Sequence, residues 1–368
     1  MSTPTDIING AKFRSDLQNT NRVLQAEWVA LFNEAVDSAW NLISEARPDF
    51  QVASYDVTLV SGNSASFQVP WNFHSVIDVV FAPDNPQQEY SLGPFNWLNR
   101  RSPGNWTWPV LSGFAGVVGA TSARLMGWLI YVEPSIRAGG PYRLWFCPKP
   151  HTVQQTVRLA TVAALPACVA AGSGPGKTLT GSALGALSVD GATVAAGDKI
   201  LVKNQVATGN NGVYTVNVAG DAGTAFVLMR TPGYDSDATI NGGIALGNIV
   251  AVGQSDEAQP VGTQEGKFFT LTTYTAIESP QAWTEGAALD AVLERFVEVL
   301  MLKMAIPALK RDARREVAAD FEKTLTGPDG KTGREGEMKA YFAVTRSPGP
   351  QKMVDTDANT WRGGWGGW

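Results

Sequence analysis

The chain has few of the side chains that metal sites and disulfide frameworks require. Its 368 residues include two cysteines, Cys147 and Cys168, and two histidines, His74 and His151. A structural zinc site takes about four Cys or His ligands, and these four positions fit no zinc spacing. We therefore expect no metal and no cofactor, and we expect both cysteines to be free thiols that pack as small apolar side chains.

Long apolar segments and a strong net charge are also absent. No run of about 18 apolar residues occurs, which excludes a membrane-spanning helix, and the segment MSTPTDIINGAKFRSDLQ lacks the apolar core of a signal peptide. The net charge is -5, so the protein has no general attraction to nucleic acid. We expect a protein that is made in a cytosol-like compartment and has no membrane partner.

The residues expected of an enzyme are missing as well. No nucleophile–base pair and no Gly-x-Ser-x-Gly elbow occurs. The stretch GSGPGKT resembles the end of a phosphate-binding loop, but the place of the first glycine is taken by Ala171, and the flanks do not read as strand and helix. We expect no catalysis, a mobile surface connector at 172–176, and a solvated Lys177.

Both ends of the chain have helical periodicity. Apolar residues recur at spacings of three and four over 1–46, which predicts a helix that ends before Pro48. A similar stripe runs from 287 to 325, where Pro307 either opens a second helix or kinks a single one. Gly327 is a natural helix stop. The polar segment 327–368 is expected to be a flexible arm unless a partner orders it.

Strand patterns occupy the region between these helices. YDVTLVSGNSASFQVP predicts a hairpin, FHSVIDVVFAP a buried strand, and GWLIYVEPSIRAGGPYRLWFCPKP two strands around a turn. The aromatic segment YSLGPFNWLNRRSPGNWTWPVLSGF lies between FHSVIDVVFAP and GWLIYVEP. It is either a contact loop or a covered irregular segment. From 153 to 285 glycine is frequent and charges are few, and short β-branched runs alternate with turns, as in a small all-β domain.

These patterns predict an α+β protein with an insertion. Residues 1–150 and 286–326 would form a discontinuous long-helix core with a small β-subdomain, and residues 151–285 an inserted all-β domain, sandwich or barrel-like. Residues 327–368 would be the arm. Such insertions are tolerated at exposed loops.

The block 157–271 resembles a β-domain that recurs in bacteriophage tail-fibre and other virion surface proteins. The matching residues are VRLAT, LSVDGATVAAGDKILVKNQ, NNGVYTV, VLMRTPGYDSDA and FFTLTT. In that family the segment before VDG is a variable glycine-rich loop, and GSGPGKT falls in it.

The flanks resemble phage head-to-tail adaptor, or connector, proteins. The match rests on a helix ending near ARPDF, the strands VTLVSGNSASFQVPWNFHSVIDVVF and PYRLWFCPKP, and the helix LDAVLERFVEVLMLKMAIPALKRDARREVAADFEKTL. The resemblance implies a twelve-fold ring that joins the portal protein to tail or nozzle proteins, with a channel for DNA and a C-terminal arm that grips the portal. The large β-insert is a departure from that family.

Two groups of residues follow as candidate contacts. Trp361, Arg362, Trp365 and Trp368 would dock the arm on the portal, the alternative being a tail with no role. Lys310, Arg311, Arg314 and Arg315 would be a solvated helix face, an inter-subunit surface or a channel lining; the acidic residues among them argue against tight DNA binding.

The resulting expectation is a structural protein of the phage neck, located in the virion and assembled in the host cytoplasm. Two rival functions remain. A tail-fibre or baseplate receptor-binding protein would use the β-domain, and a nucleotide-using packaging enzyme would use GPGKT and depend on Lys177.

Overall fold

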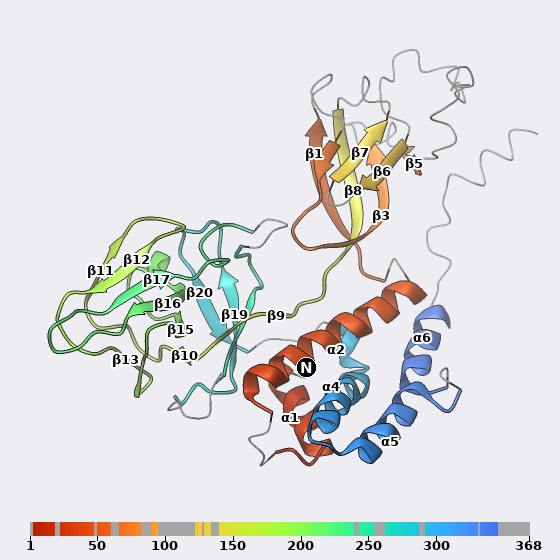
Figure 1. Ribbon diagram of the computed structural model, residues 1–368. Coiled ribbons are helices and arrows are strands. Elements are labelled where there is room, and N and C mark those ends of the chain that lie inside the picture. Colours follow the sequence, from red (N-terminus) through yellow and green to blue (C-terminus); the bar gives the residue numbers. More distant parts are fainter. Residues whose placement is uncertain are drawn as a thin grey trace, which may run out of the picture.

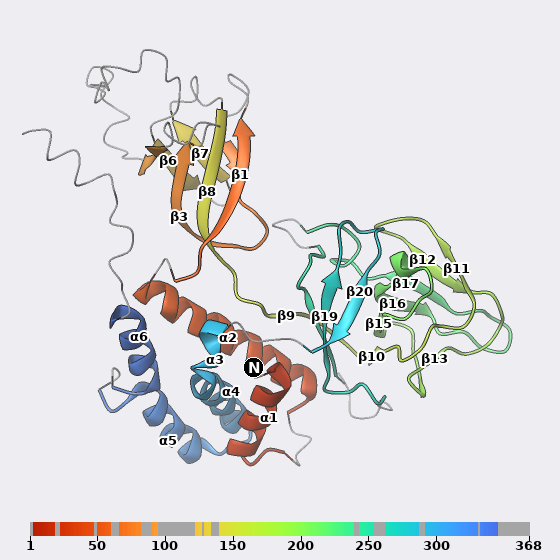
Figure 2. The ribbon, with the colours of Figure 1, turned by 180° about the vertical axis from the view of Figure 1, so that it is seen from behind.

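The computed structural model describes residues 3–18, 23–47, 50–59, 66–81, 90–94, 122–126, 129–133, 140–238, 243–253, 262–286, 291–329 and 332–344. Across these residues the fold is mixed α+β, with helices gathered in one lobe and strands in two others (Figure 1). The same three lobes are seen from behind in Figure 2.

The helical lobe combines the two ends of the described chain. Its helices are α1 (Pro4–Arg14), α2 (Gln25–Ala46), α3 (Ala291–Glu294), α4 (Val297–Arg311), α5 (Arg315–Thr326) and α6 (Arg334–Val344). One continuous apolar core holds them together, and its largest fully buried side chains include Trp28, Phe32 and Trp40 from α2. The helices far apart in sequence therefore form one folding unit.

The single helix predicted over 1–46 is wrong, because two helices cover this segment. A capping box starts α1: the Thr3 Oγ1 atom accepts a hydrogen bond from the Asp6 amide (3.2 Å), and the Asp6 carboxylate accepts one from the Thr3 amide (2.9 Å). The helix ends where the Ser15 hydroxyl bonds back to the Ala11 carbonyl (2.8 Å) and Asp16 takes a left-handed φ of 56°. Pro48 lies outside the described residues.

The C-terminal helices also differ from expectation. Pro307 lies inside α4, which continues to Arg311. The flexible arm predicted to begin at 327 is wrong over its first part, because α6 is a helix on which Met338 is fully buried and Phe342 is 6% exposed. Both side chains join the helical core, so packing against α2 and α4 stabilises a segment that its own composition does not.

The second lobe is a β-subdomain of two four-stranded sheets that share one apolar core. One sheet has the order β1-β8-β3-β4 and the other β2-β7-β6-β5. The strands are β1 (Ala53–Leu59), β2 (Ser66–Gln68), β3 (Phe73–Phe81), β4 (Tyr90–Ser91), β5 (Gly93–Pro94), β6 (Ser122–Met126), β7 (Leu129–Glu133) and β8 (Gly140–Pro148). The predicted hairpin of β1 with β2 is wrong, because β1 pairs with β8 and β2 with β7.

The third lobe, called the insert below, contains the remaining strands. They are β9 (Val153–Val157), β10 (Leu159–Ala160), β11 (Cys168–Ala171), β12 (Thr178–Gly181), β13 (Ser188–Val189), β14 (Ala192–Thr193), β15 (Lys199–Val202), β16 (Gly212–Val218), β17 (Val227–Arg230), β18 (Ile249–Val252), β19 (Phe268–Thr273) and β20 (Ala282–Glu285). A six-stranded sheet has the order β10-β15-β16-β17-β12-β11, and a four-stranded sheet the order β20-β19-β18-β9. None of the sheets closes into a barrel in the described residues.

Alternation along the strands gives the insert two apolar cores. On β15, Ile200 and Val202 join the core under the β13–β14 hairpin, while Leu201 faces the four-stranded sheet. On β16, Tyr214 joins the core under the hairpin, and Val213 faces the four-stranded sheet. The six-stranded sheet is thus buried on both faces, and one face packs on the second sheet as in a sandwich.

The four-stranded sheet also connects the insert to the helices. Val153, Ile249, Ala251 and Phe268 belong to the helical core, while the alternate residues of β18 face into the insert. The amide of Asn33 on α2 donates to the Val153 carbonyl (2.7 Å) and accepts from its N–H (2.9 Å). The insert therefore shares apolar surface with the lobe that carries it.

Candidate functional site

The first two residues of the predicted basic face lie at the end of α4. The Lys310 ammonium pairs with Glu322 of α5, and the Arg311 guanidinium pairs with Glu27 of α2 at 2.6 Å. The Lys310 and Arg311 side chains are 54% and 60% exposed. Each charge is therefore matched by a carboxylate at the surface, where such pairs add little stability and stay accessible to a partner.

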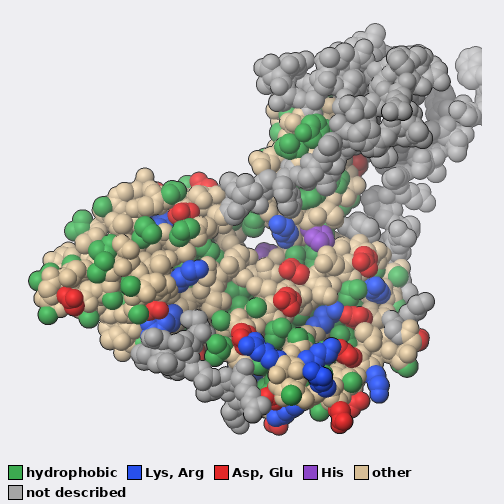
Figure 3. Space-filling model, in the orientation of Figure 1, with side chains coloured by type: hydrophobic (Ala, Val, Ile, Leu, Met, Phe, Trp, Pro, Cys, Tyr) green, Lys and Arg blue, Asp and Glu red, His purple; other side chains and the backbone are tan. Residues whose placement is uncertain are grey.

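The other two basic residues lie where α5 begins. The Arg314 guanidinium contacts the buried Asp312 carboxylate at 2.9 Å and the exposed Asp16 carboxylate at 3.4 Å. Arg315 is exposed and makes no ion pair with a described residue. Blue and red side chains intermix on the helical lobe in Figure 3. Three of the four predicted residues therefore pair with carboxylates, so the surface around them is of mixed charge.

The four predicted docking residues of the arm, Trp361, Arg362, Trp365 and Trp368, lie outside the described residues. The segment that leads toward them is α6. Its Phe342 ring packs against Phe296 (centroids 5.6 Å apart) and Phe50 (6.1 Å). Residues 345–368 therefore start from a helix that is fixed to the core.

The GSGPGKT stretch is the turn of the β11–β12 hairpin, and the expectation of a solvated Lys177 is wrong. Lys177 is 4% exposed, its ammonium pairs with the Glu278 carboxylate, and it donates to the Gly209 carbonyl at 3.0 Å. The same carboxylate accepts from the Gly174 amide at 2.7 Å. The lysine thus ties three loops of the insert together, and the turn is anchored rather than a free connector.

The pKa of Glu278 reports this arrangement. Burial alone would raise the pKa, but the hydrogen bonds from Lys177 and Gly174 together with the positive charges of Lys177 and Arg230 outweigh it, so the pKa of Glu278 lies below its ordinary value. A phosphate-binding lysine needs a free ammonium group and exposed amides at a helix N-terminus. Lys177 lies instead between strands β11 and β12 of one antiparallel hairpin.

A second buried cation lies next to this turn. Arg230, at the end of β17, is 1% exposed and donates to the Ile277 carbonyl at 2.9 Å and the Gly209 carbonyl at 3.2 Å. It also reaches the Asn211 carbonyl (3.3 Å) and the Tyr214 hydroxyl (3.3 Å). Arg230 therefore adds a donor to three backbone carbonyls, of which that of Gly209 also accepts from Lys177 and that of Ile277 also accepts from Gln281.

Arg158 repeats this role at the start of the insert. It is 7% exposed, pairs with Asp198, and donates to the Thr193 carbonyl at 3.0 Å. Arg158 and Asp198 belong to the segments VRLAT and GDKILVKNQ, and Arg230 to VLMRTPGYDSDA. The polar residues in the motifs of the insert are thus structural: they hold turns on a sheet.

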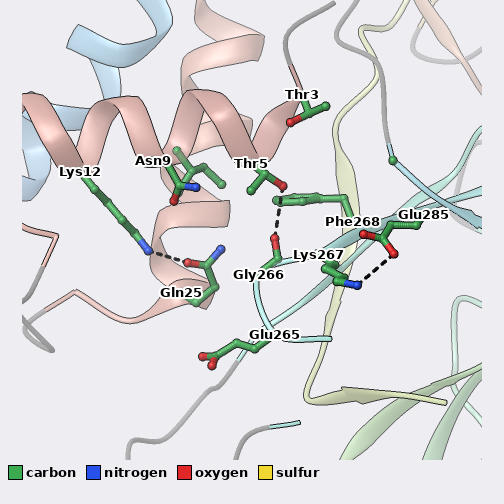
Figure 4. Close-up of a pocket in the computed structure, with 12 residues that line it drawn as sticks. Thr3, Thr5, Asn9, Lys12, Gln25, Glu265, Gly266, Lys267, Phe268 and Glu285 are labelled. Carbon is green, nitrogen blue, oxygen red and sulfur yellow. Dashed lines mark hydrogen bonds and ion pairs between the residues drawn. The ribbon is translucent and has the colours of Figure 1, made fainter. Parts of the chain in front are cut away.

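A cleft of about 570 Å³ separates α1 from the insert (Figure 4). The Thr5 hydroxyl spans it with a 3.3 Å hydrogen bond to the Gly266 carbonyl. On the helical wall the Lys12 ammonium donates to the Gln25 side chain at 2.8 Å, and on the other wall Lys267 pairs with Glu285 at 3.0 Å. Sequence reasoning missed this cleft, because it forms between segments about 250 residues apart in the chain.

The charges of this cleft are mixed: Lys12 and Glu265 lie toward one side, and the Lys267–Glu285 pair lies on the wall of the insert. Burial lowers the pKa of Lys12, and the Glu265 carboxylate across the mouth opposes that shift. Its walls hold no cysteine, histidine or serine that could act as a nucleophile or base. We interpret the cleft as the seam between two lobes.

The part of the chain that the structure describes contains neither a metal-binding cluster nor a membrane-spanning helix. No group of three or more His, Cys, Asp and Glu side chains is close enough there to hold a metal ion. None of the helices in that part of the chain has the length and hydropathy that a bilayer-spanning segment requires. Both cysteines are free; Cys147 is buried, and its burial raises the pKa of the thiol to about 11.

Comparison with known proteins adds no family assignment: no protein-family model matches the sequence, and no curated protein matches it significantly.

Proposed function

We propose that this protein is a structural component of a bacteriophage neck, a head-to-tail adaptor that forms a ring between the portal and the tail. In this proposal the ring has twelve copies, leaves a channel for DNA, and uses residues 345–368 as the docking arm. The sequence resemblances described above support it, with an adaptor-like chain carrying a virion-type β-domain. The protein has no catalytic role in this proposal.

The observation that carries the proposal is the joining of the two chain ends in one helical lobe. Helices from 4–46 and 291–344 share a core, and both β-lobes extend from it (Figures 1 and 2). This layout leaves the helical lobe free to make the head-to-tail contacts of a ring, in which two different faces of each subunit meet. The mixed charges of α4 and α5 suit such contacts, because pairs now made within one subunit can be exchanged for pairs across an interface.

Electron microscopy of the purified full-length protein, alone and with the portal protein, tests the proposal. We expect closed rings, and rings bound at the portal end that the Trp361→Ala, Trp365→Ala, Trp368→Ala triple variant fails to dock. Monomers or fibres in both samples would contradict the proposal. If the triple variant still forms rings but no longer binds the portal, the arm is needed for docking and not for ring formation.

A receptor-binding role is the second candidate, favoured by the two complete apolar cores of the insert. Deletion of 153–285 is a poor test, because it removes four side chains from the helical core. Binding of the labelled full-length protein to host cells is better. Cell binding without ring formation would favour the receptor-binding role over the adaptor.

A further inference from the structure

The three lobes meet at a second cleft, of about 520 Å³, which we call the junction cleft. Asp37 and Asn41 of α2 form one wall, Trp71, His74 and Lys149 of the β-subdomain another, and Gln154 and Asn248 of the insert the third. In Figure 3 histidine side chains and a blue side chain mark this junction, where the surface is hollowed between lobes. Its volume lies within the range of about 300–1,000 Å³ of small-molecule sites.

Two side-chain amides in the cleft are oriented by the backbone. The side-chain Oδ1 atom of Asn248 accepts a hydrogen bond from the Ala245 N–H, and the side-chain Oε1 atom of Gln154 accepts one from the Ile249 N–H at 2.5 Å. A backbone N–H can only donate, so the oxygen end of each amide is fixed and the NH₂ end is left over. Asn248 is only 4% exposed. Neither NH₂ group makes a hydrogen bond with a described residue, so the cleft holds two prearranged donors.

An acceptor and an aromatic surface complete the lining. The Asp37 carboxylate makes no hydrogen bond or ion pair with a described residue. Trp71 is 40% exposed in the turn before β3, so part of its indole faces solvent at the cleft. Burial lowers the pKa of His74, with Asp37 opposing and Lys149 reinforcing the shift, so the ring is neutral near pH 7. The cleft then carries no net charge, because the Asp37 carboxylate and the Lys149 ammonium group balance each other.

We propose that the junction cleft binds a neutral saccharide. Sugar hydroxyls both donate and accept, which matches two amide donors and a carboxylate acceptor. The C–H face of a sugar ring is flat and apolar and suits a half-exposed indole, which offers a large rigid contact area. A phosphorylated ligand fits less well, because a cleft with one carboxylate and one ammonium group has no net positive charge to attract it. The inference does not depend on ring formation.

Saturation-transfer NMR on the full-length protein tests it, with glucose, galactose, N-acetylglucosamine, lactose and chitobiose as probes. We expect transfer to the ring protons of at least one sugar. Trp71→Ala should weaken its binding by about fivefold or more, as truncation of an aromatic anchor does. Asp37→Asn should also weaken it, and because this change keeps the side-chain volume it decides the matter if Trp71→Ala fails to fold.

Tyr55→Ala is the matched control, because Tyr55 is a 39% exposed aromatic residue of the same lobe that does not line the cleft. It should bind sugar as the unmodified protein does. Inorganic phosphate should not displace the sugar; displacement would make the cleft an anion site and overturn the proposal. Absence of transfer to every sugar, or equal transfer in all variants, would also overturn it.

Discussion

Two cations of the insert and two of the helical lobe lie in opposite environments. In the insert, Lys177 and Arg230 are buried and bind carbonyl and carboxylate groups from loops far away in sequence. On the helices, Lys310 and Arg311 are more than half exposed, although each also has a carboxylate partner. The presence of an ion pair therefore does not tell whether a charge stabilises the fold or is accessible to a binding partner. The exposed fraction of the paired side chains does.

This difference has a physical basis in solvation. A buried cation has lost its hydration, so removal of its partners or of the cation itself leaves polar groups without compensation. An exposed cation keeps most of its hydration and can change partners at small cost. We infer that the buried cations of the insert maintain its fold, and that the exposed cations at the end of α4 are free to contact other subunits. Lys303 of the same helix belongs with the buried charges, because its side chain is 13% exposed and pairs with Glu335.

Replacement of Arg230 should have the largest effect. Arg230→Ala removes hydrogen bonds to three backbone carbonyls and leaves a cavity, so we expect a loss of about 3–4 kcal/mol in the free energy of unfolding. Urea denaturation followed by circular dichroism measures it. Lys267→Ala, which removes an exposed cation of the same lobe, is the control and should cost under about 1 kcal/mol. Equal losses of unfolding free energy in Arg230→Ala and Lys267→Ala would contradict the distinction between buried and exposed cations.

Lys177→Ala should come next, with a loss of about 1–3 kcal/mol, because Glu278 is left with one backbone donor but is itself partly exposed. The same variant tests the nucleotide hypothesis. We expect neither the unmodified protein nor the variant to bind ATP in equilibrium dialysis. ATP binding that disappears in the variant while its stability is unchanged would show that the lysine acts as a phosphate ligand.

Acidification should weaken the same contact. Because the pKa of Glu278 in the folded protein is below the ordinary value of 4.5, the unfolded chain binds the proton first as the pH falls. The stabilisation is thus complete above about pH 5 and is lost as the pH falls through the folded-state pKa. Unfolding midpoints measured in urea across this range should fall less steeply for Lys177→Ala. If the midpoints of the two proteins fell in parallel with pH, the contact with Lys177 would not be what lowers the pKa of Glu278.

Local patterns predicted most of the elements, and long-range packing decided the rest. The short β-branched runs of 153–285 were predicted to be strands, and three of them, KILVKNQ, NNGVYTVNV and AFVLMRTP, contain β15, β16 and β17. The partners of these elements depend on contacts that no local pattern encodes. The partner of Lys177 lies 101 residues away. The buried apolar side chains that α6 shows among its described residues are Met338 and Phe342, and both pack in the core formed by helices from both parts of the chain.

The candidate site shows the same limit. Sequence reasoning chose Lys310, Arg311, Arg314 and Arg315 because they are close in sequence. It did not predict that Glu322, Glu27 and Asp312 pair with the first three of them. Sequence reasoning missed the junction cleft, whose three walls take single residues from within 37–41, 71–149 and 152–248. Local sequence carries no signal for such a site, because no two of its walls belong to one element.

The smallest effect is expected at Lys310, and it decides whether the helical charges are free. A double-mutant cycle of Lys310→Ala and Glu322→Ala should give a coupling energy of about 0.2–1 kcal/mol in urea denaturation, because both side chains are about half exposed. High salt should reduce it further. A coupling that matches the loss in Lys177→Ala would place this pair among the structural charges and remove the distinction between the lobes. A small coupling, together with impaired ring formation in Lys310→Ala, would show that Lys310 contributes more to contacts between subunits than to the fold of one subunit.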